Sequence, residues 1–170
     1  MSIAQALLAE FEHESQTTRK FLERVPQDKL RWRPHEKSHT TGELALHIAT
    51  LPAVISRFVL ADASPIPSPA DIFKQPETVQ QILTAHETSG AAVREILPTL
   101  NDARLQSNWS ALVDGKPVLT VPKVMVLRLF MLNHWIQHRG QLGVHLRLIG
   151  AKVPASYGPS GDESPFGAPA

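Results

Sequence analysis

The chain has 170 residues and contains no cysteine. It therefore offers no thiolate as a nucleophile or metal ligand, and it needs no oxidising compartment to form disulfides. An excess of charge is also missing, because 17 Lys and Arg residues oppose 16 Asp and Glu residues and the formal net charge is +1. Neither sign forms a long run, so the composition argues against a nucleic-acid partner. Any bound metal must be held by nitrogen and oxygen atoms.

Long hydrophobic runs are absent as well. The most apolar stretch, residues 124–132, is interrupted by Arg128 and falls well short of the roughly 18 residues that a membrane-spanning helix needs. The N-terminal residues lack the positively charged start of a secretory signal, and Glu10 breaks their apolar run early. We therefore expect a cytoplasmic protein without membrane contacts.

Apolar residues recur at helical spacing in four segments, and proline or glycine follows several of them. Pro26 and Pro98 come after the first and third segments, and Gly150 comes after the fourth. The second segment opens with a capping-box pattern, in which the side chains of Thr40 and Glu43 each satisfy a backbone N–H group of the other residue. The predicted helices cover residues 3–25, 40–60, 76–97 and 120–149.

Two connections between these helices are long. Residues 61–75 contain three prolines and are predicted to form a crossover between helices two and three. Residues 101–119 include Trp109 and the turn signal Asp114-Gly115, and they form either a small hairpin or a loop.

The fold class predicted from these segments is all-α, a four-helix bundle with a long crossover between helices two and three. We expect the bundle to occupy residues 1–150. Residues 151–170 are rich in proline and glycine and have little hydrophobic periodicity, so they are predicted to form an extended C-terminal tail that packs on the bundle.

Three histidines are the strongest candidates for a metal site. His134 and His138 lie four residues apart on one helical face, where Cβ atoms are about 5–6 Å apart and both imidazoles reach one ion at about 2.0–2.1 Å. His47 falls on the inward face of helix two. Burying two imidazoles without partners costs about 1–3 kcal/mol each, and a shared divalent ion would satisfy them together. Three protein ligands also leave a position for water or substrate, as in catalytic zinc sites.

Zinc and nickel both suit imidazole ligands, and iron or cobalt would also fit. The metalloprotease helix motif is excluded, because Trp135 follows His134 where that motif requires a glutamate.

Other polar residues also fall on inward faces. Glu14 either faces a polar cavity, where it would be a candidate catalytic base, or lies at the edge of the apolar stripe of helix one. His86 is either a further site residue or a core residue satisfied by a hydrogen bond. His145 lies nearly two turns from His138 and is expected to line the bundle. The histidines expected at the surface or in a solvated loop are His13, His35 and His39.

Four stretches together resemble the DinB family, the DinB/YfiT-like four-helix metalloenzymes, over nearly the whole chain. They are Leu30-Arg31-Trp32-Arg33-Pro34, Gly42-Glu43-Leu44-Ala45-Leu46-His47-Ile48, His134-Trp135-Ile136-Gln137-His138-Arg139-Gly140-Gln141 and Val153-Pro154-Ala155-Ser156-Tyr157-Gly158-Pro159-Ser160. The resemblance implies an up-down-down-up order of helices, frequent homodimers, and a divalent ion bound by His47, His134 and His138. Some related proteins act as thiol-dependent transferases or isomerases.

Together, the residues and the resemblance lead us to expect a divalent-metal-dependent enzyme that acts on a small molecule. The reaction would be hydrolysis or thiol-dependent transfer, with a low-molecular-weight thiol as a candidate partner. The alternative is a non-catalytic stress or ligand-binding module, in which the ion is structural and only fastens helix two to helix four.

Overall fold

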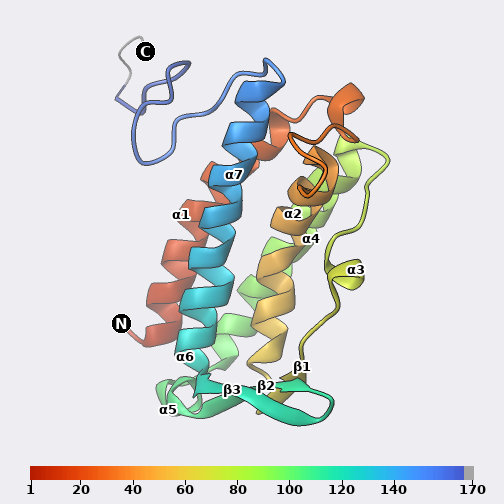
Figure 1. Cartoon of the computed structure of the whole chain (residues 1–170). Helices are drawn as coiled ribbons and strands as arrows, with labels where there is room; N and C mark the ends of the chain where they lie inside the picture. The colour runs from red at the N-terminus through yellow and green to blue at the C-terminus, as the bar shows by residue number, and fades with distance from the viewer. Residues whose placement is uncertain (167–170) are drawn as a thin grey trace.

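The computed structural model describes residues 1–166, and most of them are helical (Figure 1). The long helices are α1 (Ile3–Glu23), α2 (Thr41–Phe58), α4 (Val79–Ile96) and a continuous column formed by α6 (Lys123–Val126), the π-helix η3 (Leu127–Asn133) and α7 (His134–Leu148). Short helical turns connect them: η1 (Gln27–Lys29), α3 (Pro69–Ile72), η2 (Leu97–Thr99) and α5 (Asp102–Gln106).

The prediction of an all-α four-helix bundle, up-down-down-up, is wrong, because the chain also contains a three-stranded mixed sheet. Its strands are β1 (Ala63–Pro65), β2 (Asn108–Val113) and β3 (Lys116–Pro122). β1 pairs in parallel with β2, and β2 pairs antiparallel with β3. Figure 1 shows this sheet across one end of the long helices.

The sheet arises from two segments with different local signals. Asp114 and Gly115 have positive φ angles of 50° and 74°, which suit the two-residue turn of a tight hairpin. Of the two structures predicted for residues 101–119, the hairpin is therefore the one that forms, and α5 precedes it. β1 has only three residues and includes Pro65, so it carries no periodic pattern of its own. Its hydrogen-bonding partner lies more than forty residues away in the sequence, at Ser110–Leu112.

The helices enclose one apolar core. α2 packs along α4 and against α7, and α1 packs against α4 and α7. The capping box at Thr40 and Glu43 is present at the start of α2. At the sheet end, the fully buried Lys123 donates from Nζ to Oδ1 of Asp62 at 2.7 Å, which joins the start of α6 to the residue before β1.

The chain beyond α7 returns over α1 and α7. Asp162 pairs with Arg147 of α7 at 2.6 Å, and the hydroxyl of Tyr157 donates to Glu14 of α1 at 2.9 Å. The last four residues of the predicted tail, 167–170, lie outside the described residues. Among the helices of residues 1–166, none is both long and apolar enough to cross a lipid bilayer.

Candidate metal centre

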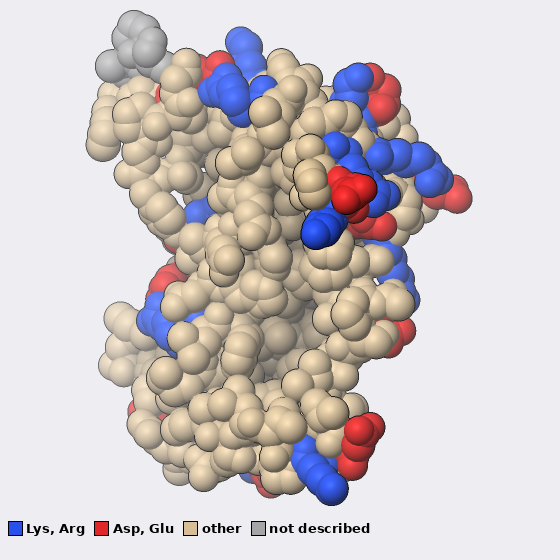
Figure 2. Space-filling model, viewed as in Figure 1, with Lys and Arg blue, Asp and Glu red and all other residues tan. Residues whose placement is uncertain are grey.

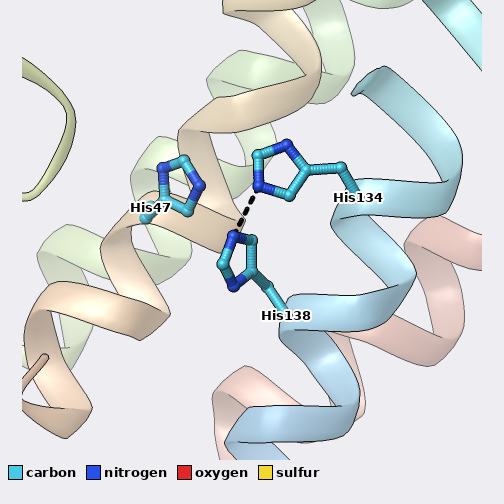
Figure 3. A group of neighbouring side chains, drawn as sticks. All are labelled: His47, His134 and His138. Carbon is cyan, nitrogen blue, oxygen red and sulfur yellow. Dashed lines mark hydrogen bonds between the residues drawn. The ribbon is translucent and has the colours of Figure 1, made fainter. Parts of the chain in front are cut away.

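Three imidazoles from α2 and the start of α7 converge on a common point (Figure 3). One ring nitrogen from each of His47, His134 and His138 lies within 4.8 Å of the other two. The Nε2 atoms of His134 and His138 face each other at 2.6 Å. The structure thus brings together the three residues that the sequence analysis singled out as ligands.

His47 is the most buried of the three, with 3% of its surface exposed. Its Nε2 atom is buried and has no hydrogen-bond partner in the described part of the chain. Burial, followed by the neighbouring rings of His138 and His134, lowers the pKa of His47 to about 3. Burial is also the main cause that lowers the pKa values of His134 and His138. Three neutral imidazoles with an orphaned buried nitrogen among them are a donor set that fits a divalent transition-metal ion.

Gln141 sets the tautomer of His138. Its side-chain oxygen Oε1, which only accepts, lies 2.8 Å from Nδ1 of His138. Nδ1 therefore carries the hydrogen, and Nε2 keeps the lone pair that faces the other imidazoles. Gln141 was not among the residues predicted for the site. The signal that points to it is its spacing of three residues from His138 on the same helical face.

A proline in α2 helps to hold α7 in place beside His47. Pro52 lacks an N–H group, so it cannot bond to the carbonyl of Ile48 one turn earlier. That carbonyl instead accepts the indole Nε1–H of Trp135 at 2.8 Å. Because Ile48 follows His47 and Trp135 follows His134, this bond links α2 and α7 immediately beside the three histidines. Trp135 also stacks on Phe11 of α1, with ring centroids 5.3 Å apart.

The helical column that carries His134 is not uniform. The sequence predicted a regular helix over residues 120–149, whereas residues 127–133 form the π-helix η3, which ends directly before His134. A π-turn takes in one residue more than an α-turn, so it shifts which side chains face inward. Such interruptions occur frequently at functional sites. The regular apolar stripe through these residues gives no sign of it.

A cavity of about 340 Å³ opens beside the histidines, with His47 and His134 in its wall. It is bounded by α2, the crossover 61–75, the sheet and η3. Figure 2 shows a hollow in this face of the molecule, and the residues around it are mostly uncharged. Phe73, from the segment after α3, lies over the histidine group, with its ring centroid 4.5 Å from that of His47. His39 stacks on Phe73 at 3.5 Å and lies outside the group of three.

Glu14 is buried rather than at the edge of its stripe, and it is not part of the histidine group. Its Oε2 atom accepts from Arg139 of α7 at 2.6 Å, and its Oε1 atom accepts from Tyr157 at 2.9 Å. Thr18, which shares the stripe, also accepts from Arg139, at 3.2 Å. With both oxygens occupied, the carboxylate forms a buried ion pair between α1 and α7, and this arrangement does not support a role as a free base.

Two further buried histidines, His86 and His145, each contact a hydroxyl group of a neighbouring helix. Nε2 of His86 lies 3.2 Å from the hydroxyl oxygen of Ser15, and burial lowers the pKa of His86. This agrees with a core residue that has a hydrogen bond, although Nδ1 has no partner within the described residues. Nδ1 of His145 lies 3.2 Å from the hydroxyl oxygen of Thr41, at the start of α2.

A mainly helical fold with three convergent histidines from α2 and α7 defines a class of candidate metal-binding proteins. The sequence profile of the DinB family matches residues 1–165, and the chain belongs to that family. It is similar to the uncharacterized protein YrdA of Bacillus subtilis strain 168, with 28% identity over 158 residues that cover 92% of this chain and 89% of YrdA.

Two solved structures share the fold. A DinB-like protein from Bacillus cereus ATCC 10987 matches with a TM-score of 0.71 and 24% identity, covering 90% of this chain and 97% of that one. The DinB-like protein YjoA from Bacillus subtilis matches with a TM-score of 0.69 and 23% identity, covering 89% of this chain and 96% of that one. At these identities the likeness concerns the fold.

Proposed function

We propose that this protein binds one divalent metal ion through His47, His134 and His138 and uses it for chemistry on a small molecule, either hydrolysis or thiol-dependent transfer. The observation that carries the proposal is the buried Nε2 of His47, which has no partner in the described chain and faces two further neutral imidazoles. Zinc and nickel are the ions that suit this ligand set best.

The chain itself would contribute three things to the reaction. Gln141 fixes the tautomer of His138, so that Nε2 is free to bind the ion. Phe73 shields His47 from solvent on one side, and the apolar cavity lies on another. A divalent ion held by three neutral imidazoles supplies a Lewis acid with a coordination position left for the substrate. No cysteine is available, so any thiol would come from a cosubstrate.

The alternative is a structural ion that fastens α2 to α7. One feature favours it, because the proposed ligands come from exactly those two helices. A purely structural ion needs no adjacent cavity, however, and the space of about 340 Å³ beside His47 and His134 supports a small-molecule site.

The test combines metal analysis with turnover. We expect the purified protein to hold close to one equivalent of zinc or nickel, and we expect His138→Ala to lose it, while His13→Ala, at an exposed position, keeps it. Metal-loaded protein is then assayed with a panel of esters and of thiols paired with electrophiles. The enzyme proposal is overturned if no substrate turns over in the metal-loaded protein, or if His138→Ala retains the activity. Metal binding without turnover would leave the structural alternative.

A further inference from the structure

We propose that the molecule bound at this site has an uncharged, apolar body that occupies the cavity and a polar head group that reaches the histidines. The apolar body is inferred from the cavity itself. The role of the head group rests on the proposed function, because it requires an ion at His47, His134 and His138.

The wall of the cavity is apolar nearly throughout. α2 contributes Leu51, Ile55 and Phe58, and the crossover contributes Pro65 and Ile66. Such a surface gains about 25 cal/mol for each Å² of apolar ligand area that it removes from water, and it offers nothing to a charged group. The histidines lie at the edge of this apolar wall, so one end of a bound molecule would meet nitrogen ligands and the rest would meet carbon.

The sheet, which lies across one end of the long helices, supplies another part of the wall. Ala111 of β2 pairs directly with Leu119 of β3, and both line the cavity. Trp109, two residues before Ala111, lines it as well and stacks on Phe58 with ring centroids 5.8 Å apart. Side chains alternate along a strand and paired residues share a face, so Trp109, Ala111 and Leu119 lie on one face of the sheet. Val118 has no partner on β2, because the pairing register shifts there, and it does not line the cavity. The hairpin therefore presents a continuous apolar face to the ligand.

The wall contains few polar groups besides the histidines. The hydroxyl of Thr50 donates to the carbonyl of Leu46 at 3.0 Å, within α2. Asp71 is the one charged side chain among the described residues of the wall, and its Oδ2 accepts from the hydroxyl of Ser68 at 2.6 Å. The Thr50 hydroxyl thus has its partner within α2, and Asp71 is exposed, so its charge is solvated at the rim of the cavity and does not select a polar body. The unpartnered buried nitrogen of His47 is the polar feature that remains for the ligand or its ion.

The volume limits the size of the body. About 340 Å³ is near the lower end of the range of about 300–1,000 Å³ for small-molecule sites. The apolar body that fits is therefore small, such as one aromatic ring or a short branched aliphatic chain. A large hydrophilic molecule would have to leave most of its surface outside the cavity.

The test compares two zinc-binding probes that differ only in their body. We expect benzohydroxamate to bind the zinc-loaded protein about tenfold more tightly than acetohydroxamate, measured by calorimetry, since a tenfold gain requires burial of only about 55 Å² of apolar area. Leu119→Asp should abolish this preference. Val118→Asp, at the neighbouring position of β3 that does not line the cavity, should retain it. Both side chains are partly exposed, at 38% and 57%, so the fold should tolerate either change.

The outcomes separate this inference from the proposed function. Equal affinities for the two probes, or a preference that survives Leu119→Asp in folded protein, overturn the apolar body. If Leu119→Asp does not fold, Ile66→Asp replaces it, because Ile66 lines the cavity and is 52% exposed. If the protein binds neither zinc nor nickel, the proposed function fails, and ligand-observed NMR of toluene with the metal-free protein then tests the apolar body alone. Toluene binding that Leu119→Asp removes supports the apolar body, and no toluene binding overturns it.

Discussion

A single hydrogen bond, from Nδ1 of His138 to Gln141, decides which nitrogen of that ring faces the ion site. We expect Gln141→Leu to weaken zinc binding about 10–100-fold, because residues that orient a ligand imidazole have effects of this size. Competition with a chromophoric chelator measures the change. Gln137→Leu is the matched control, since Gln137 is exposed on the same helix and its side chain makes no hydrogen bond to His138 among the described residues. Equal losses in both variants would contradict the assigned role.

The buried pair of Glu14 and Arg139 makes a different prediction. Glu14→Leu leaves the guanidinium of Arg139 buried without its partner, and we expect a loss of about 3–5 kcal/mol in the free energy of unfolding. Glu12 also lies on α1, and Glu12→Leu breaks its half-exposed pair with Arg94 of α4. This change should cost no more than about 1 kcal/mol. Urea denaturation compares the two. A similar small loss in both variants would show that the buried pair contributes no more to the free energy of unfolding than the half-exposed pair.

The positions of the three histidines could be predicted from the sequence, whereas the partners of Glu14 could not. The reason is physical. The spacing of His134 and His138 is a property of one helix, and the inward position of His47 follows from the periodicity of another. The partners of Glu14 lie 125 and 143 residues further along the chain, at Arg139 and Tyr157. Local patterns carry no information about such pairs.

Among the helices, the contact between α2 and α7 can be tested by a double-mutant cycle. Trp135→Phe removes the donor to the carbonyl of Ile48 and should cost about 1–3 kcal/mol, because that buried acceptor is left unsatisfied. In the Pro52→Ala background a backbone N–H again becomes available to the same carbonyl. We therefore expect Trp135→Phe to cost about 1 kcal/mol less there. The measurement is the free energy of unfolding of all four proteins, and strict additivity would refute the shared acceptor.

The sheet shows why the predicted fold class was wrong. The helices carry amphipathic periods and caps, which are local signals, and they lie close to where the sequence places them. β1 forms because β2 and the end of α2 lie beside it, so its existence depends on the tertiary structure. The strands matter to the site, because β2 and β3 supply part of the wall of the cavity. The π-helix before His134 could not be predicted either, since the apolar residues in it have the spacing of an ordinary α-helix.

The protein holds several histidines in neutral form in its interior, and this ties its overall stability to pH. Burial is the main cause that lowers the pKa in each case: His47, His86, His134, His138 and His145. In the unfolded chain a histidine takes up a proton near pH 6.5. Protons therefore bind the unfolded state first, and the stability that these residues contribute is complete above pH 6.5 and is lost as the pH falls towards their folded pKa values.

For the metal-free protein we accordingly expect the free energy of unfolding to fall between pH 7.5 and pH 5. His47, with a pKa of about 3, accounts for about 2 kcal/mol of this loss at pH 5, since each pH unit below 6.5 is worth about 1.4 kcal/mol. Urea denaturation in the presence of a chelator, repeated at several pH values, measures it. His47→Gln should flatten the pH dependence, and His13→Gln, at an exposed position, should not. Adding zinc should steepen the loss, because the ion binds only deprotonated imidazoles and is released as they take up protons. A stability that does not change across this range would contradict the burial of neutral histidines on which the metal site depends.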